Sequence, residues 1–337
     1  MVARKPKFCG WGYEGDGLTP DEHEMVLQRY ADHFDVAGFE QLIEPPTPDQ
    51  VNLHNARVEP PAKLSGFCST ADMDRLSHTY GKSFPDYVRI YAKDFTNAPD
   101  IVAYAKSEDD IDAVLDWATG ANIAVIPFGG GSSVVGGVEP AVGGAFAGTL
   151  SLDLTGLDQI LEIDKTSRAA RMQGGIRCPD IEDGLRPQGL TMRHFPQSFD
   201  LATLGGMIAT RSGGHYATVY THIDDFVEST RMMTPAGTME SRRLPGSGAG
   251  PSPDRMAIGS EGSLGIITEA WMRLQDRPNQ RRSTAINFDS FERAVEAVRQ
   301  LTQSGLFPSN VRLLDRMEAM LNGAGDGSHD VVVLGFE

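Results

Sequence analysis

The stretch that decides the fold of this chain reads Ile126-Pro127-Phe128-Gly129-Gly130-Gly131-Ser132-Ser133-Val134. The apolar residues 123–127 before the glycines predict a short buried strand. Glycines let the backbone bend through positive φ, and successive N–H groups in such a turn form an anion-binding concavity. The pattern therefore predicts a strand that leads into a cradle for a pyrophosphate. Taken alone, an ordinary glycine-rich turn is the alternative.

This loop differs from the two common phosphate-binding loops. No Lys-Ser or Lys-Thr pair closes it, as a P-loop requires. Val134 stands where the Rossmann turn needs its third glycine, and no clear βαβ unit with an acidic ribose ligand follows. The pattern therefore favours a dinucleotide that is held outside a Rossmann fold.

Two later segments support a ligand-binding role for the loop. Residues 258–270 carry three glycines at a spacing of three, followed by Ile266-Ile267-Thr268, which is typical of a turn at a ligand that leads into a strand. Residues 196–211 are first polar, then apolar around the pair Gly205-Gly206, and end in a basic residue.

Together and in this order, these segments resemble the FAD-binding domain of the vanillyl-alcohol-oxidase (PCMH-type) flavoproteins. Within that superfamily, the chain is similar to the alkylglycerone-phosphate synthase family. The resemblance spans most of the chain, and further stretches that carry it are Phe8 to Tyr13, Asn97 to Val102, Met233 to Gly237 and Ser309 to Asp315.

The resemblance implies an α+β fold class. A PCMH-type FAD-binding domain with two α/β subdomains is followed by the first part of a ferredoxin-like α+β cap domain. We expect an N-terminal arm or helical segment over residues 1–60, the FAD-binding domain over 61–275 and a partial substrate-binding cap domain over 276–337. The cap begins as βαβαβ and stops in mid-sheet, which leaves an edge strand exposed.

Capping residues and periodicity predict the individual elements. Ser107 is expected to open a helix that Gly120 ends, and the hairpin 160–173 turns at 165–167. Other helices are expected at 19–30, 179–186, 291–301 and 316–321, and other strands at 150–154, 230–234, 265–271, 283–288, 311–315 and 331–336.

By resemblance, four segments contact FAD. The first is the glycine loop, in which backbone N–H groups would hold the phosphates. The segments consist of Pro127, Phe128, Gly129, Gly130, Gly131, Ser132 and Ser133; of Pro196, Gln197, Ser198, Phe199, Asp200, Leu201 and Ala202; of Ala209, Thr210, Arg211 and Ser212; and of Glu261, Gly262, Ser263, Leu264, Gly265, Ile266 and Ile267. A buried glycine-pair helix start and a strand with a bulge are the structural alternatives for the later segments.

Some relatives attach FAD covalently through a histidine in an Arg-Ser-Gly-Gly-His-like first glycine loop. Here Gly131 holds that place, and the similar run that ends in His215 comes much later in the chain. We therefore expect non-covalent FAD, with His215 as a surface or lining residue. Arg243 is a weak candidate for a substrate phosphate, since Arg binds phosphate through a bidentate fork; a solvated basic loop is the alternative.

Composition limits the partners of the protein. The net charge of −16 argues against nucleic acid and anionic membrane surfaces, but it allows a local basic pocket for a phosphorylated substrate. No apolar run is long enough for a transmembrane helix. The three cysteines, Cys9, Cys68 and Cys178, lack metal-ligand spacing, so we expect no metal and a reducing compartment. A cytoplasmic protein with a small-molecule or lipid-like substrate is expected; peripheral membrane association and homodimerisation stay open.

The resemblance also implies a reaction. In that family, the acyl chain of acyl-dihydroxyacetone phosphate is exchanged for a long-chain alcohol through a flavin N5 adduct, in ether lipid synthesis. Its acid/base groups, a Tyr and a run of His residues, lie in a C-terminal part that nothing here matches, so we expect a C-terminal truncation and assign no catalytic residues. An FAD-linked dehydrogenase or oxidase of a 2-hydroxy acid or alcohol is one alternative, and an inactive flavin-binding fragment is the other.

Overall fold

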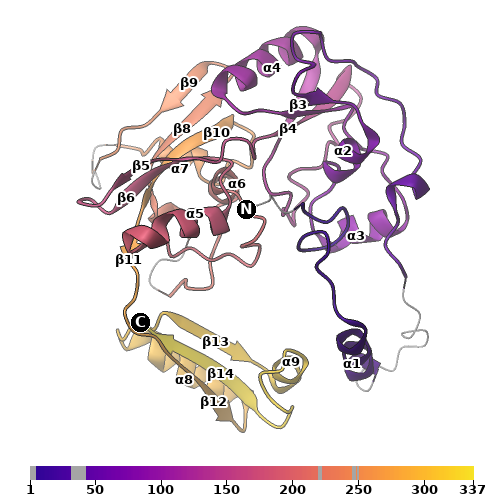
Figure 1. Cartoon of the computed structure of the whole chain (residues 1–337). Coiled ribbons are helices and arrows are strands. Elements are labelled where there is room, and N and C mark those ends of the chain that lie inside the picture. Colours follow the sequence, from indigo (N-terminus) through magenta and orange to yellow (C-terminus); the bar gives the residue numbers. More distant parts are fainter. Residues whose placement is uncertain (1–4, 32–42, 219–221, 245–247, 249) are drawn as a thin grey trace. The chain divides into compact units, whose positions relative to one another are not determined.

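The computed structural model describes residues 5–31, 43–218, 222–244, 248 and 250–337. These residues belong to two compact units (Figure 1). The first unit consists of Met1–Glu14, Pro45–Ser212 and Ile223–Gln275, and the second of Gly15–Glu44, Gly213–His222 and Asp276–Glu337. The expected N-terminal segment 1–60 is therefore divided between the two units.

A four-stranded sheet in the order β1-β2-β4-β3 forms one half of the first unit (Figure 1). Its strands are β1 (Cys68–Ser69), β2 (Ile101–Tyr104), β4 (Gly148–Asp153) and β3 (Ile123–Phe128), and the last three run parallel. Because β2 and β3 flank β4 in register, their carboxyl ends meet at one edge of the sheet.

Helix α4 (Glu108–Ala121) packs against this sheet and closes its core. Ser107 caps it by accepting a hydrogen bond from the Asp110 amide, as the sequence predicts. The expected end at Gly120 is wrong by one residue, because Asn122 takes the left-handed conformation at the C-terminal cap, with a φ of +56°. The apolar face of the helix is buried against the alternating residues of the strands.

The other half of the first unit is an antiparallel five-stranded sheet in the order β5-β6-β10-β8-β9. Its strands are β5 (Ile160–Asp164), β6 (Ala169–Gln173), β10 (Ile266–Arg273), β8 (Val227–Thr234) and β9 (Gly237–Glu240). Helices α5 (Cys178–Leu185), α6 (Leu204–Ala209) and α7 (Asp254–Ala257) accompany it.

An ion pair joins α4 to the second sheet. Arg231 of β8 donates to both carboxylate oxygens of Glu108, at 2.8 and 2.7 Å, and Thr268 of β10 donates to the same carboxylate at 2.5 Å. These hydrogen bonds lower the pKa of Glu108 against the effect of burial, with the bond from Arg231 contributing most. The contacts connect the two sheets within one unit.

The remaining elements of the first unit are short. They are the helices α2 (Asp72–Ser77) and α3 (Phe84–Tyr91), the single turns η1 (Pro48–Gln50), η2 (Arg186–Gln188) and η3 (Ile223–Asp225), and the two-residue strand β7 (Leu190–Thr191). The boundary between the units falls within β11 (Gln275–Asp276).

In the second unit, β12 (Arg282–Phe288), β14 (Asp330–Phe336) and β13 (Asn310–Leu314) form an antiparallel sheet in that order. Helices α8 (Phe291–Gln303) and α9 (Arg316–Leu321) connect its strands, and α1 (Pro20–Ala31) belongs to the same unit. The last strand thus lies between the other two, and β12 and β13 form the edges. None of the helices described is both long and apolar enough to cross a membrane.

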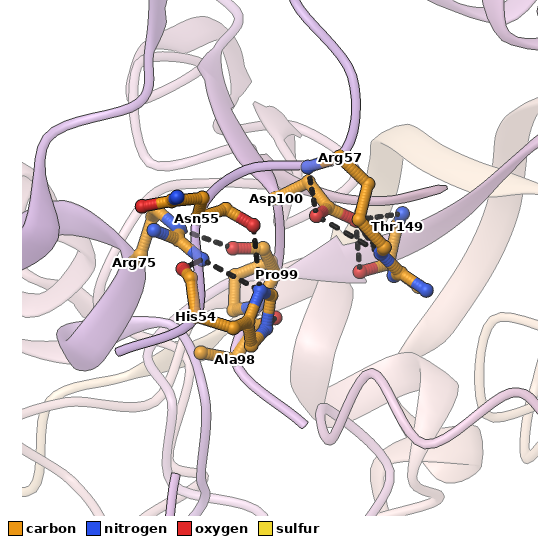
Figure 2. Close-up of polar contacts among 8 residues, drawn as sticks. All are labelled: His54, Asn55, Arg57, Arg75, Ala98, Pro99, Asp100 and Thr149. Atoms are coloured by element: carbon orange, nitrogen blue, oxygen red, sulfur yellow. Dashed lines mark hydrogen bonds and ion pairs between the residues drawn. The ribbon is translucent and has the colours of Figure 1, made fainter. Parts of the chain in front are cut away.

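Buried polar contacts tie the segment before β1 to the parallel sheet (Figure 2). Asp100, which is 0% exposed, accepts bonds from the Arg57 amide at 2.8 Å and from the Thr149 amide at 2.7 Å, and it pairs with the Arg57 guanidinium. Figure 2 shows Arg75 and His54 making a second set of contacts beside it, in which Arg75 donates to the carbonyls of Pro99 and His54. Burial alone would raise the pKa of Asp100, but the bonds from Arg57 and Thr149 together hold it below its usual value.

We expect Asp100→Ala to lower the free energy of unfolding by about 3 kcal/mol, because the buried Thr149 amide, the partly buried Arg57 amide and a guanidinium lose their acceptor. Solvent screens the half-exposed Arg57, so most of the loss comes from the amides. The folded-state pKa lies below the unfolded value of about 4, so the stabilisation is complete above that value and is lost as the pH falls through the folded pKa. Urea unfolding of wild type and variant from pH 7 to 3 measures the loss of stability. Asp116→Ala, at an exposed position of α4, is the control. An equal loss of stability in both variants would contradict the role assigned to Asp100.

Candidate cofactor site

The glycine loop begins at the carboxyl edge of the parallel sheet. Tyr104, Asp153 and Phe128 end their strands side by side in register, and the loop leaves directly after Phe128. Ligands of α/β sheets bind outside this edge, because the loops and their free N–H groups gather there. The predicted strand and loop therefore lie at the edge of the sheet where ligands of such folds bind.

The glycines of the loop are required by close packing. A Cβ atom on Gly130 would collide with the Leu201 carbonyl oxygen, and one on Gly129 would collide with the Thr203 hydroxyl. Gly131 has a φ of +61°, in the left-handed region that favours glycine. The loop thus lies with bare backbone against residues 201–203, which belong to the second predicted segment and its continuation.

The structure brings the predicted segments together in the first unit. The Glu261 amide donates to the Ala209 carbonyl at 2.9 Å, which joins the last segment to the third. A Cβ on Gly262 would lie 3.3 Å from Pro127, at the start of the glycine loop. Arg211 and Glu261 both take left-handed φ values, of +52° and +51°, so their turns are tightly constrained. Their contact with FAD stays a prediction.

Several side chains of these segments already have protein partners. Ser133 accepts from the Gly137 amide at 3.1 Å, and Ser212 bonds the His194 ring at 2.6 Å. The Arg211 guanidinium pairs with Asp224 at 3.0 Å. The Asp200 carbonyl accepts the Tyr13 hydroxyl at 2.5 Å, which links the N-terminal segment to the second loop. The side chains of Ser133, Arg211 and Ser212 would therefore have to exchange these partners before they could bind a cofactor.

One hydroxyl at the site has no partner. The Oγ atom of Ser260 is buried and makes no hydrogen bond to any described residue. It lies in the turn between Gly259 and Glu261, next to the last predicted segment. A buried donor without a partner costs about 1–3 kcal/mol, so such a group commonly contacts a ligand. The bare glycine loop and this hydroxyl fit a phosphate-bearing cofactor such as FAD.

A buried histidine beneath the loop was missed by the sequence analysis. His78 bonds Asp153 at 3.0 Å through Nε2, and its ring lies 4.3 Å from the ring of Phe128. Asp153 also accepts from the Thr155 amide at 2.7 Å. An aspartate at the end of an apolar strand was a usable signal for Asp153, whereas nothing around His78 in the sequence indicated this contact.

Arg243 has partners other than a phosphate. Its guanidinium pairs with Glu228 at 2.8 Å and Asp164 at 2.9 Å, and it lies 4.1 Å from the ring centroid of Trp271. The Ser167 amide and hydroxyl, followed by Arg243, lower the pKa of Asp164 to about 2. A phosphate at Arg243 would have to displace two carboxylates, so the sequence-based expectation for this residue finds no support in the geometry.

Two known protein families match parts of this chain. The FAD binding domain family matches residues 99–241, and the C-terminal domain of FAD linked oxidases matches residues 277–331. The chain has the PCMH-type FAD-binding fold, and the two matched domains indicate FAD as its cofactor.

Among individual proteins, it is similar to alkyldihydroxyacetonephosphate synthase from Dictyostelium discoideum, with 34% identity over 84% of this chain and 48% of the relative. A solved structure of an alkyldihydroxyacetonephosphate synthase superposes with a TM-score of 0.86 at 28% identity, over 98% of this chain and 68% of the other. The glycolate oxidase subunit GlcD of Bacillus subtilis is 28% identical over 67% of this chain and 48% of its own length. The chain spans about half the length of these curated relatives.

We expect Gly130→Ala to weaken FAD binding on the order of tenfold, because the overpacking cost of about 1–3 kcal/mol falls on the loop that cradles the cofactor. Gly144→Ala is the matched control, since a Cβ there meets nothing within 4 Å. Titration of flavin fluorescence measures both variants. Equal FAD affinities in the two would show that the close approach at Gly130 does not shape the site.

Ser260→Ala tests the unpartnered hydroxyl. We expect FAD affinity to fall about three- to tenfold, whereas the stability of the FAD-free protein stays within about 0.5 kcal/mol of wild type, because no hydrogen bond to a described residue is lost. Ser65→Ala removes an exposed hydroxyl and serves as the control. A stability loss without any change in FAD affinity would assign Ser260 a structural role instead.

Proposed function

We propose that this protein is an FAD-dependent enzyme of ether lipid synthesis, which exchanges the acyl chain of acyl-dihydroxyacetone phosphate for a long-chain alcohol. The observation that carries the proposal is the superposition of nearly the whole chain on a solved alkyldihydroxyacetonephosphate synthase. The glycine loop and the segments around it support the cofactor part of the proposal.

The reaction breaks the bond between the carbon of dihydroxyacetone phosphate and the acyl oxygen, so the fatty acid leaves as its carboxylate. The oxygen of the alcohol forms the new bond to the same carbon and gives up its proton, and no net oxidation occurs. FAD supplies the reactive ring chemistry when it is bound, and the protein supplies binding and orientation. We assign the binding role to the four segments that meet around Gly130 and Glu261, with backbone N–H groups of residues 129–133 as the phosphate donors.

A second candidate is an FAD-linked oxidoreductase that acts on a 2-hydroxy acid. Its support is the similarity to the glycolate oxidase subunit and to D-lactate dehydrogenase [cytochrome] of Arabidopsis thaliana, at 28% identity in both cases. An inactive flavin-binding protein is the third candidate. Three free cysteines support a reducing, cytoplasmic location.

The reaction class is tested with the FAD-loaded chain. We expect palmitoyl-dihydroxyacetone phosphate and hexadecanol to give hexadecyl-dihydroxyacetone phosphate and palmitate in equal amounts, detected by mass spectrometry, without reduction of an artificial electron acceptor. Acceptor reduction with glycolate or D-lactate, and no alkyl product, would replace the proposal with the oxidoreductase. If FAD binds and neither reaction occurs, the inactive protein is the correct candidate.

Acid precipitation tests the mode of FAD attachment. We expect all flavin colour in the supernatant, because Gly131 offers no nucleophile in the first loop. Burial, and then Arg312, lowers the pKa of His215, which favours the neutral ring. His215→Ala is expected to release flavin in the same way as wild type; colour that stays in the pellet for wild type alone would identify His215 as an attachment point.

A further inference from the structure

A cavity of about 420 Å³ lies at the amino edge of the parallel sheet in the first unit. Its walls come from the segment 54–57, from residues 96–98 before β2, and from the loop before β4 together with Thr149. The glycine loop leaves the opposite edge of this sheet, beside Asp153. The four residue steps of β4 from Thr149 to Asp153, at about 3.3 Å each, separate the two edges by about 13 Å. No residue of the four predicted FAD segments is among the described residues that line this cavity.

A buried carboxylate fixes the guanidinium of Arg57 at the wall of the cavity (Figure 2). Asp100 accepts from Nε of Arg57 at 3.1 Å and from Nη2 at 2.7 Å. The Nη1 atom makes no hydrogen bond to a described residue, and half of the Arg57 side chain is exposed. Arg57 therefore offers an oriented donor at its outer edge.

Asp100 does not compete for a ligand at that edge. Its carboxylate is 0% exposed and also accepts from the Thr149 amide at 2.7 Å and from the Thr149 hydroxyl at 3.3 Å. Both of its oxygens are thus used inside the protein. The carboxylate orients Arg57 from behind, and a ligand would bind through hydrogen bonds to the outer edge of the guanidinium.

The other polar groups around the cavity also favour an anion. No acidic residue is among the described residues that line it, and Glu139, beside the loop, binds Arg89 at 2.8 Å and the Asn97 amide nitrogen at 2.9 Å. Gly143 has a φ of +78°, and its amide bonds no described residue. Amides in such turns bind anions. Donors on two separate segments suit the three oxygens of a phosphate group.

The remaining wall suits a flat organic group. The His54 ring is fixed at both nitrogens, because Nε2 lies 3.2 Å from the Ala98 carbonyl oxygen and Nδ1 lies 3.3 Å from the Arg75 guanidinium (Figure 2). Pro140 and Val142 add apolar surface. A fixed ring favours stacking of an aromatic ligand. The volume lies in the range of about 300–1,000 Å³ that organic ligands occupy, which is more than a phosphate group alone requires.

We propose that this cavity binds a nucleoside monophosphate, with its phosphate at Arg57 and Gly143 and its base against His54. The site is separate from the predicted FAD contacts. Binding there does not require the proposed acyl exchange, so the two proposals fail independently.

The test uses calorimetry on the FAD-saturated chain, with AMP, UMP and inorganic phosphate as probes. UMP is included because FAD contains no uracil. Wild type is expected to bind at least one nucleotide about tenfold more tightly than phosphate, since only the nucleotide contacts the His54 wall.

Two variants and a control locate the bound nucleotide. Arg57→Lys keeps the charge and removes the planar fork, and Val142→Glu adds a carboxylate to the lining; each is expected to weaken nucleotide binding about tenfold. Val88→Glu adds the same charge at an exposed position of α3, outside the lining, and should leave the affinity unchanged.

Three results would overturn the proposal. The first is the absence of nucleotide binding to wild type up to about 1 mM. The second is equal affinity for nucleotide and inorganic phosphate, because the site would then recognise the anion alone. The third is nucleotide affinity within twofold of wild type in both Arg57→Lys and Val142→Glu, which would place the nucleotide elsewhere.

A second measurement covers the case in which Arg57→Lys does not fold. Arginines of the wild-type, FAD-saturated chain are labelled with phenylglyoxal, with and without nucleotide, and are quantified by mass spectrometry. The nucleotide should protect Arg57 severalfold and leave Arg186, an exposed arginine outside the lining, unprotected. Labelling of Arg57 that neither AMP nor UMP changes would overturn the proposal without any variant.

Discussion

The close approach of two backbones is the constraint on which the rest of the site depends. The loop at Gly130 lies against the Leu201 carbonyl with no space for a side chain, so the parallel sheet and the segment 196–202 meet through main chain alone. Bare main chain presents N–H groups at a spacing that side chains cannot reach, which suits a pyrophosphate. Any residue other than glycine at this contact would force the glycine loop away from the Leu201 carbonyl.

The two sheets are held in place so that this contact persists. On the carboxyl side, His78 and Asp153 support the ring of Phe128, from which the loop departs. On the other side, the carboxylate of Glu108 binds Arg231 and Thr268, so the start of α4 is fixed to β8 and β10. Since β10 begins at Ile266, directly after the last glycine turn, the same contacts position the turn that carries Ser260 and Glu261.

Local signals in the sequence predicted most of the fold. Local sequence alone defines α4, because Ser107 caps its start, apolar residues recur at helical spacing and Asn122 takes the left-handed conformation after its end. The predicted end was Gly120. The strands at 123–128 and 266–273 follow from β-branched residues between turn residues, and the hairpin of β5 and β6 follows from its turn at 165–167. The order of the strands in the last sheet could not be predicted, because no local signal indicates that β14 pairs with both β12 and β13.

At the candidate site, too, local features could be predicted and long-range contacts could not. The glycine turns were found from sequence, because close packing restricts the residue type at those positions. The partners of Arg243 were not found, because Glu228 and Asp164 are brought to it only by the pairing of distant strands. A charged side chain in a sequence indicates a function only when its neighbours in space are known.

A phosphate cradle built from backbone does not by itself decide the reaction class. If the N–H groups around Gly130 hold the phosphates of FAD, as we propose, they do so whatever the flavin ring does, so the same loop suits a synthase and an oxidoreductase alike. The side chains near the loop must therefore decide which substrate enters. Both candidate reactions act on anions, a phosphate ester in one case and a carboxylate in the other. Discrimination between the two must therefore come from the rest of the substrate, a long hydrocarbon chain in one case and a small hydroxy acid in the other.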